Sequence, residues 1–114
     1  MVLRCRDELD IATVPLLRAA VARAEAVAPE VVLVDLREVT FLDSAGFHAL
    51  DDAARRLGRL GAWCGFADPA SEGVRRALDL CDLARNLPRW PTVAETLRAS
   101  DAREPARAAT RVGG

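Results

Sequence analysis

The stretch VVLVDLREVTFLDSAGF, residues 31–47, decides the fold class of this 114-residue chain. Its first six residues, VVLVDL, are almost entirely apolar, which is the pattern of a central strand buried on both faces. Residues 45–60 then place apolar side chains three and four positions apart, which predicts an amphipathic helix. Ser44 therefore lies where a buried strand gives way to a helix, and it could be a helix cap, a nucleophile or a switch.

The remaining residues continue this alternation of strands and helices. Further strands are predicted over residues 2–9, 62–67 and around 86–87, and further helices over residues 14–28, 69–81 and 93–99. This order predicts an α/β fold with a small, mostly parallel sheet of about four strands and helices packed mainly on one side. The tail, residues 100–114, has no apolar periodicity and ends in glycines, so we expect one domain over residues 1–99 and a disordered C-terminal tail.

Composition excludes several classes of partner. The net charge is −1, with 29% charged and 51% hydrophobic residues, so nothing favours nucleic acid or an anionic membrane surface. No apolar run approaches the roughly 18 residues of a membrane span. The three cysteines are widely spaced in apolar surroundings, which is typical of core residues in a reducing compartment. We therefore expect a cytoplasmic protein without direct membrane insertion.

The sequence contains little that predicts an enzyme. Ser44 is followed one helical turn later by His48, the only histidine, but no acid is placed to complete a catalytic triad. One histidine and scattered cysteines give no metal-ligand spacing, and no phosphate-binding glycine loop is present. We expect no catalytic residues, no metal and no cofactor.

Two readings of Ser44 remain open on the residues alone. Serine is a favoured N-cap, and its hydroxyl could satisfy an amide of the following helix, for about 1 kcal/mol. A helix N-terminus that carries small residues, here Ala45 and Gly46, can also accommodate a phosphate through its free amides and its dipole.

The segment VVLVDLREVTFLDSAGFHAL resembles the central signature of the STAS domain of bacterial anti-sigma factor antagonists, with D-S-x-G at its core. The resemblance extends to DELDIATVPLLRAAV before it and LGAWCGFADPASEGVRRALDLCDL after it. It implies that Ser44 is a phosphoacceptor for a partner that is both anti-sigma factor and serine kinase of the ATPase fold. The unphosphorylated antagonist binds this partner and the phosphorylated form releases it. Residues implied to bind the partner are Asp43, Ala45, Gly46 and Phe47.

The resemblance also leaves an alternative and identifies a departure. Other STAS domains are docked constitutively in larger assemblies, such as a lipid ABC transporter or a stressosome-like complex. Family members commonly carry an extra strand before the G-E-L-D motif, whereas few residues precede Asp7, which stands at the position of that glycine. A less covered sheet edge would favour a weak homodimer.

Overall fold

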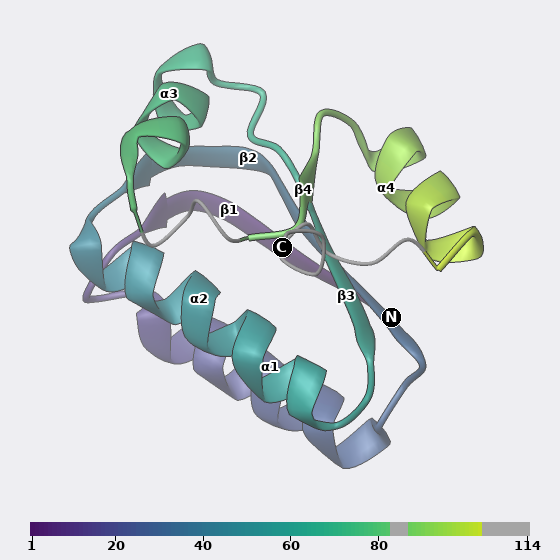
Figure 1. Cartoon of the computed structure of the whole chain (residues 1–114). Coiled ribbons are helices and arrows are strands. Elements are labelled where there is room, and N and C mark those ends of the chain that lie inside the picture. The colour runs from purple at the N-terminus through teal and green to yellow at the C-terminus, as the bar shows by residue number, and fades with distance from the viewer. Residues whose placement is uncertain (83–86, 104–114) are drawn as a thin grey trace.

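The structure, a computed structural model, describes residues 1–82 and 87–103. Within these residues, four strands and four helices alternate along the chain (Figure 1). They are β1 (Val2–Leu9), α1 (Val14–Val27), β2 (Val31–Leu42), α2 (Ser44–Arg59), β3 (Trp63–Ala67), α3 (Glu72–Leu80), β4 (Arg89–Trp90) and α4 (Val93–Asp101). The strands form one parallel sheet in the order β1-β2-β3-β4, which confirms the predicted α/β fold.

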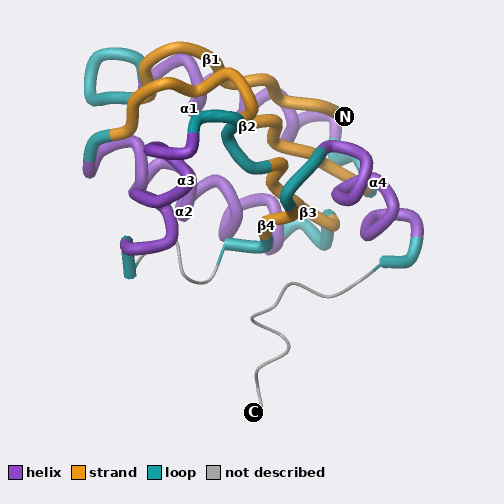
Figure 2. Tube along the Cα trace, turned by 90° about the horizontal axis from the view of Figure 1, so that it is seen from above, coloured by secondary structure: helices purple, strands orange, loops and turns teal. Residues whose placement is uncertain are grey.

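The main hydrophobic core lies on one face of the sheet. Val32, Val34 and Leu36 of β2 belong to a buried cluster that also contains apolar residues of α1, α2 and α3. Leu33 alternates onto the opposite face, where α4 contacts β2 and β3. Figure 2 shows α2 and α3 on one side of the strands and α4 on the other. The prediction that helices pack mainly on one side is therefore confirmed.

Strand β2 extends well beyond the predicted segment of residues 31–36 and ends at Leu42. It contains extra residues relative to β1, because Arg4 pairs with Asp35 whereas Arg6 pairs with Glu38. Such bulges break the alternation of apolar and polar side chains, which is why the sequence pattern alone ended the strand too early.

Asp7 has a backbone φ of 60°, in the left-handed region that favours glycine. It lies next to the second shift in the register between β1 and β2. The conformation gives a physical reason for a glycine at this position of the related G-E-L-D motif, and aspartate is among the residues that tolerate it best.

Three further predicted boundaries are wrong by more than one residue. Helix α3 begins at Glu72 rather than at residue 69, because the Ser71 side chain accepts the Val74 N–H and caps the helix there. Strand β4 comprises Arg89–Trp90 rather than residues 86–87, and residue 86 lies outside the described residues. Helix α4 continues two residues past position 99, and residues 104–114 of the predicted tail lie outside the described part of the chain.

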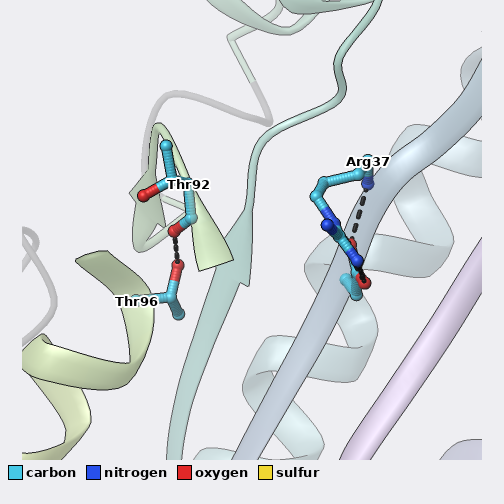
Figure 3. Close-up of polar contacts among 4 residues, drawn as sticks. Arg37, Thr92 and Thr96 are labelled. Atoms are coloured by element: carbon cyan, nitrogen blue, oxygen red, sulfur yellow. Dashed lines mark hydrogen bonds and ion pairs between the residues drawn. The ribbon is translucent and has the colours of Figure 1, made fainter. Parts of the chain in front are cut away.

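Thr92 is the N-cap of helix α4, and its hydroxyl accepts the Glu95 N–H at 3.0 Å. The buried Thr96 hydroxyl donates to the Thr92 carbonyl at 2.7 Å (Figure 3). The buried Ser100 hydroxyl donates to the Leu97 carbonyl in the same way. These polar side chains can be buried under the helix because each has a hydrogen-bond partner.

The two tryptophans of the chain meet across β3 and β4. The rings of Trp63 and Trp90 have centroids 5.4 Å apart. Gly65 lies beneath them, and a Cβ atom at this position would lie 2.4 Å from the Trp63 ring. A glycine is therefore required for Trp63 to fold over its own strand.

Asp35 is a buried carboxylate in the central strand. Its oxygens accept hydrogen bonds from the Arg37 backbone N–H at 3.0 Å and from the Arg37 guanidinium at 3.0 to 3.3 Å (Figure 3). Burial alone would raise the pKa of Asp35, but the hydrogen bonds and charge of Arg37, with the more distant charge of Arg4, outweigh it and hold this pKa below its ordinary value.

We expect Asp35 to contribute to acid sensitivity. A carboxyl whose pKa is lower in the folded than in the unfolded chain stabilises the fold above its unfolded pKa, about 3.9, and this contribution is lost as the pH falls through the folded pKa. Asp35→Asn should therefore flatten the fall in unfolding free energy below about pH 4. Urea denaturation across a pH series measures this slope. Arg37→Gln should also flatten it, and wild-type slopes in both variants would contradict the assignment.

Candidate functional site

The junction between β2 and α2 is capped by Asp43. Its backbone is extended, and its Oδ1 atom accepts the Gly46 N–H at 2.9 Å. Ser44 is the first residue of the helix, so the reading of Ser44 as the N-cap is wrong. The cap lies one residue earlier because the carboxylate of Asp43 reaches the third amide of the helix, the usual geometry of an N-cap.

The Ser44 side chain is exposed at the start of α2. Within the described part of the chain, its hydroxyl makes no hydrogen bond to another protein group, since Asp43 performs the capping. A serine that is neither buried nor needed as a cap has its hydroxyl available to another molecule.

Asp43 also holds a second segment of the chain at the same place. Its Oδ2 atom accepts the backbone N–H of Ile11, in the loop between β1 and α1, at 3.2 Å. The Ile11 side chain is 78% exposed. One carboxylate therefore fixes both the helix that begins with Ser44 and the loop that presents Ile11.

The loop between β1 and α1 is ordered by its own polar residues. Asp10 accepts the N–H groups of Ala12 and Thr13 through Oδ1, both at 3.0 Å. The Thr13 hydroxyl donates to the Glu8 carbonyl at 2.8 Å. Thr13 is the N-cap residue of α1, but its side chain makes no capping bond to the helix and links the loop to the end of β1 instead.

Gly46 allows α2 to approach the end of β1 closely. A Cβ atom at this position would lie 2.3 Å from the Leu9 carbonyl oxygen and 2.9 Å from the Leu42 side chain. The Asp43 N–H donates to the same Leu9 carbonyl at 3.4 Å. Gly46 is buried, so it shapes the site through backbone approach.

The other residues that the sequence implicated lie at the same junction. Asp43, Ala45 and Phe47 are half-buried, and Ala45 and Phe47 pack against the main core. One exposed apolar residue at this junction, Ile11, was not identified from the sequence. The sequence signal was an apolar side chain among polar ones, in DIAT, but only the folded chain places Ile11 beside Asp43.

Among the residues that the structure describes, no group of three or more histidine, cysteine or acidic side chains could hold a metal ion. Burial raises the pKa of the Cys64 thiol to about 12, and burial together with the charge of Asp35 raises that of Cys5 to about 11. Both thiols are therefore protonated near neutral pH, which disfavours them as nucleophiles. No helix among the described residues has the length and apolar character needed to cross a membrane.

The STAS domain model matches residues 1–96 of this chain. The chain therefore belongs to the STAS domain family. The crystal structure of an anti-sigma factor antagonist from Mycobacterium paratuberculosis is similar, with 30% sequence identity and a TM-score of 0.75 over 86% of this chain and 82% of that chain. A search of the curated proteins found no match.

Two more distant structures share the fold. The anti-sigma factor antagonist SpoIIAA in its unphosphorylated form has 20% identity and a TM-score of 0.62 over 91% of this chain and 89% of that chain. A sulfate transporter family protein from Wolinella succinogenes has 16% identity and a TM-score of 0.74 over 89% of this chain and 84% of that chain. At these identities, the likeness concerns the fold alone.

We predict that Gly46→Ala destabilises the protein by about 2 to 3 kcal/mol, because the new methyl group would overlap the Leu9 carbonyl. Gly58→Ala in the same helix is the matched control. A Cβ there meets nothing within 4 Å, so this change should stabilise the helix by about 0.5 kcal/mol. Urea denaturation compares the two, and equal effects would contradict the close approach at Gly46.

We predict that Asp43→Ser separates the two roles of Asp43. Serine can still cap α2 by accepting the Gly46 N–H, but it lacks the second oxygen that accepts the Ile11 N–H. Amide hydrogen exchange measured by NMR should show faster exchange at Ile11 and little change at Gly46. Asp43→Ala should accelerate both and cost about 1 kcal/mol of stability. Unchanged exchange at Ile11 in both variants would show that the carboxylate does not hold the loop.

Proposed function

We propose that this protein is an anti-sigma factor antagonist whose binding to its partner is switched by phosphorylation of Ser44. The proposed partner is an anti-sigma factor that is also a serine kinase of the ATPase fold, in the cytoplasm. The unphosphorylated chain binds this partner and frees the sigma factor, and phosphorylation of Ser44 releases the partner. The chain is not an enzyme in this scheme, because the partner supplies the ATP, the metal and the catalytic base.

One observation carries the proposal: the Ser44 hydroxyl is exposed and free of the capping role, which Asp43 fulfils. The hydroxyl can therefore enter a kinase active site without uncapping α2. The start of the helix also favours a negative group electrostatically, through its dipole and its free amides. Phosphorylation should thus leave the fold intact.

The negative charge of a phosphate on Ser44 would also oppose binding of the partner. A phosphoserine carries about −1.5 to −2 charges near neutral pH. A phosphate on Ser44 would lie next to the Asp43 carboxylate. A partner surface suited to the neutral Ser44 hydroxyl would then face two negative charges, and burying them would add a desolvation cost. The consequence is release of the partner without unfolding.

The proposed docking face extends from Ser44 to the neighbouring loop. Ile11 is 78% exposed, and its backbone is held by the Asp43 carboxylate. Apolar side chains near the centre of an interface contribute most to affinity when they are rigidly presented. We therefore assign Ile11 to partner binding together with the start of α2, where the half-buried Asp43, Ala45 and Phe47 and the buried Gly46 support the surface.

A second candidate function is a STAS subunit docked constitutively in a larger assembly, such as a lipid ABC transporter or a stressosome-like complex. The observation that favours it is the similar fold of the sulfate transporter family protein. In such a subunit the same face would bind without phosphorylation. Phosphorylation of Ser44 therefore discriminates between the two candidates.

The first test is phosphosite mapping by mass spectrometry after incubation with ATP, magnesium and lysate of the native host. We expect a single phosphate on the Ser44 peptide, absent from Ser44→Ala and retained in Ser71→Ala, because Ser71 is engaged as the cap of α3. If Ser44 stays unmodified while the protein still captures a stable set of partners, constitutive docking is favoured over the switch.

The second test measures affinity for the anti-sigma factor purified from the same host. We expect Ser44→Ala to bind as tightly as wild type and Ser44→Asp to bind at least about tenfold more weakly. Ser71→Asp is the charge-matched control, since aspartate can also cap α3, and it should bind normally. Equal affinities of Ser44→Ala and Ser44→Asp would contradict the switch.

A further inference from the structure

The two segments that meet at Ser44 contain no permanent positive charge. Residues 7–17 comprise the end of β1, the loop after it and the start of α1, and residues 38–54 comprise the end of β2 and most of α2. None of the 16 basic residues of the chain lies in either segment, whereas acidic residues occur in both. Apart from the amides at the start of α2, these segments therefore offer a phosphate on Ser44 only negative fixed charges.

His48 is the one side chain in these segments that can become positive near neutral pH. Histidine gains its charge between about pH 5 and 8. His48 is exposed on α2, and its imidazole has no hydrogen-bond or ion-pair partner among the described residues. Ser44 is exposed four residues earlier on the same helix. Residues with this spacing have Cβ atoms about 5 to 6 Å apart on one face, so the imidazole can reach a phosphate on Ser44.

The order of the two residues along α2 favours an ion pair. A negative group four residues before a positive one is the better orientation on a helix, because it also agrees with the helix dipole. Ser44 is the first residue of α2, where the dipole favours a negative group. His48 is the fifth residue, and the unfavourable effect of the dipole on a cation falls off within the first turn.

The acids that could compete for His48 on its own helix have other partners. Asp52 lies four residues after His48, but it also lies 3.9 Å from the Arg56 guanidinium. Asp51 pairs with Arg55 at 3.0 Å. A doubly charged phosphate therefore outweighs either carboxylate as a partner of the imidazolium.

The elements that pack against α2 add few competing charges. In the loop before α1, Asp10 accepts backbone N–H groups, and in β2 the buried Asp35 is paired with Arg37. Strand β3 has no charged residue. On α1, Glu25 is paired with an arginine of α2, whereas Arg18 is exposed. Arg18 is therefore the alternative cation that an experiment has to exclude.

We propose that the His48 imidazolium binds the phosphate on Ser44, by donating a hydrogen bond to a phosphate oxygen one helical turn away. This inference rests on the proposed function, because it takes Ser44 as the phosphoacceptor, and it adds a second residue to the modification site. His48 lies outside the hydrophobic core, so it is free to serve the phosphorylated form alone. In mildly acidic solution the imidazolium offsets one charge of the phosphate, so the charge that opposes partner binding depends on pH.

Phosphorus NMR of the full chain, with phosphoserine incorporated at position 44 during translation, tests the proposal without any kinase. We expect the second titration midpoint of the phosphate to lie about 0.2 to 0.4 pH units lower with His48 present than in His48→Gln, because the imidazolium stabilises the dianion. His48→Arg keeps a cation at this position and should retain the low midpoint. Arg18→Gln is the matched control, because it removes a cation from α1, and it should leave the midpoint unchanged.

The same titration in urea separates helix geometry from mere closeness in sequence. In the unfolded chain the two residues no longer share a helix face, so the effect of His48→Gln should vanish. An effect that persists in full in urea would overturn the pairing on the helix. Equal midpoints with and without His48 in the folded chain would overturn the proposal, as would a larger effect of Arg18→Gln than of His48→Gln. Phosphorylation by the host lysate and binding of the anti-sigma factor are measured on separate samples, so a failure of the switch and a failure of this pairing are distinguishable.

Discussion

The Asp43 carboxylate is the interaction on which the candidate site depends. One oxygen caps α2 through Gly46, and the other holds the backbone of Ile11. The close contact of Gly46 with the Leu9 carbonyl brings these segments together. Residues far apart in the sequence thus become one surface, and Ser44 is left at its centre without a structural task. Because Asp43 rather than Ser44 caps α2, a change at the Ser44 side chain leaves this cap in place.

The order of strands and helices could be predicted because it rests on local patterns. Residues 31–36 are almost all apolar, as in a strand buried on both faces, and the apolar residues of α2 recur at helical spacing. Each pattern indicates directly which side chains are buried. The predictions failed where tertiary geometry overrides pattern. The register shifts extend β2 to Leu42, and Ser71 rather than Pro69 begins α3. A cap can also shift by one position without any change in periodicity, so the sequence left open a capping role for Ser44 that Asp43 fulfils in the structure.

The candidate site could be proposed from the sequence, but the sequence did not indicate which distant residues lie beside it. The D-S-x-G signature identified the junction at Ser44, because residues there are adjacent in the chain. Ile11 joins the site only through a hydrogen bond across 32 positions of sequence, which no periodicity records. The STAS fold accommodates proteins as different as the anti-sigma factor antagonists and a transporter family protein, so specificity must reside in such added surfaces rather than in the fold itself.

The paired tryptophans above Gly65 have an optical consequence. The chain has two tryptophans and no tyrosine, and both indoles belong to this pair. Trp63 follows the same alternation along β3 as Gly65, which pairs with Leu33 on the face that α4 covers. Intrinsic emission from the folded protein therefore originates almost entirely at the junction of β3 and β4. It responds to the integrity of the α4 face, whereas events confined to the start of α2 are nearly silent in fluorescence.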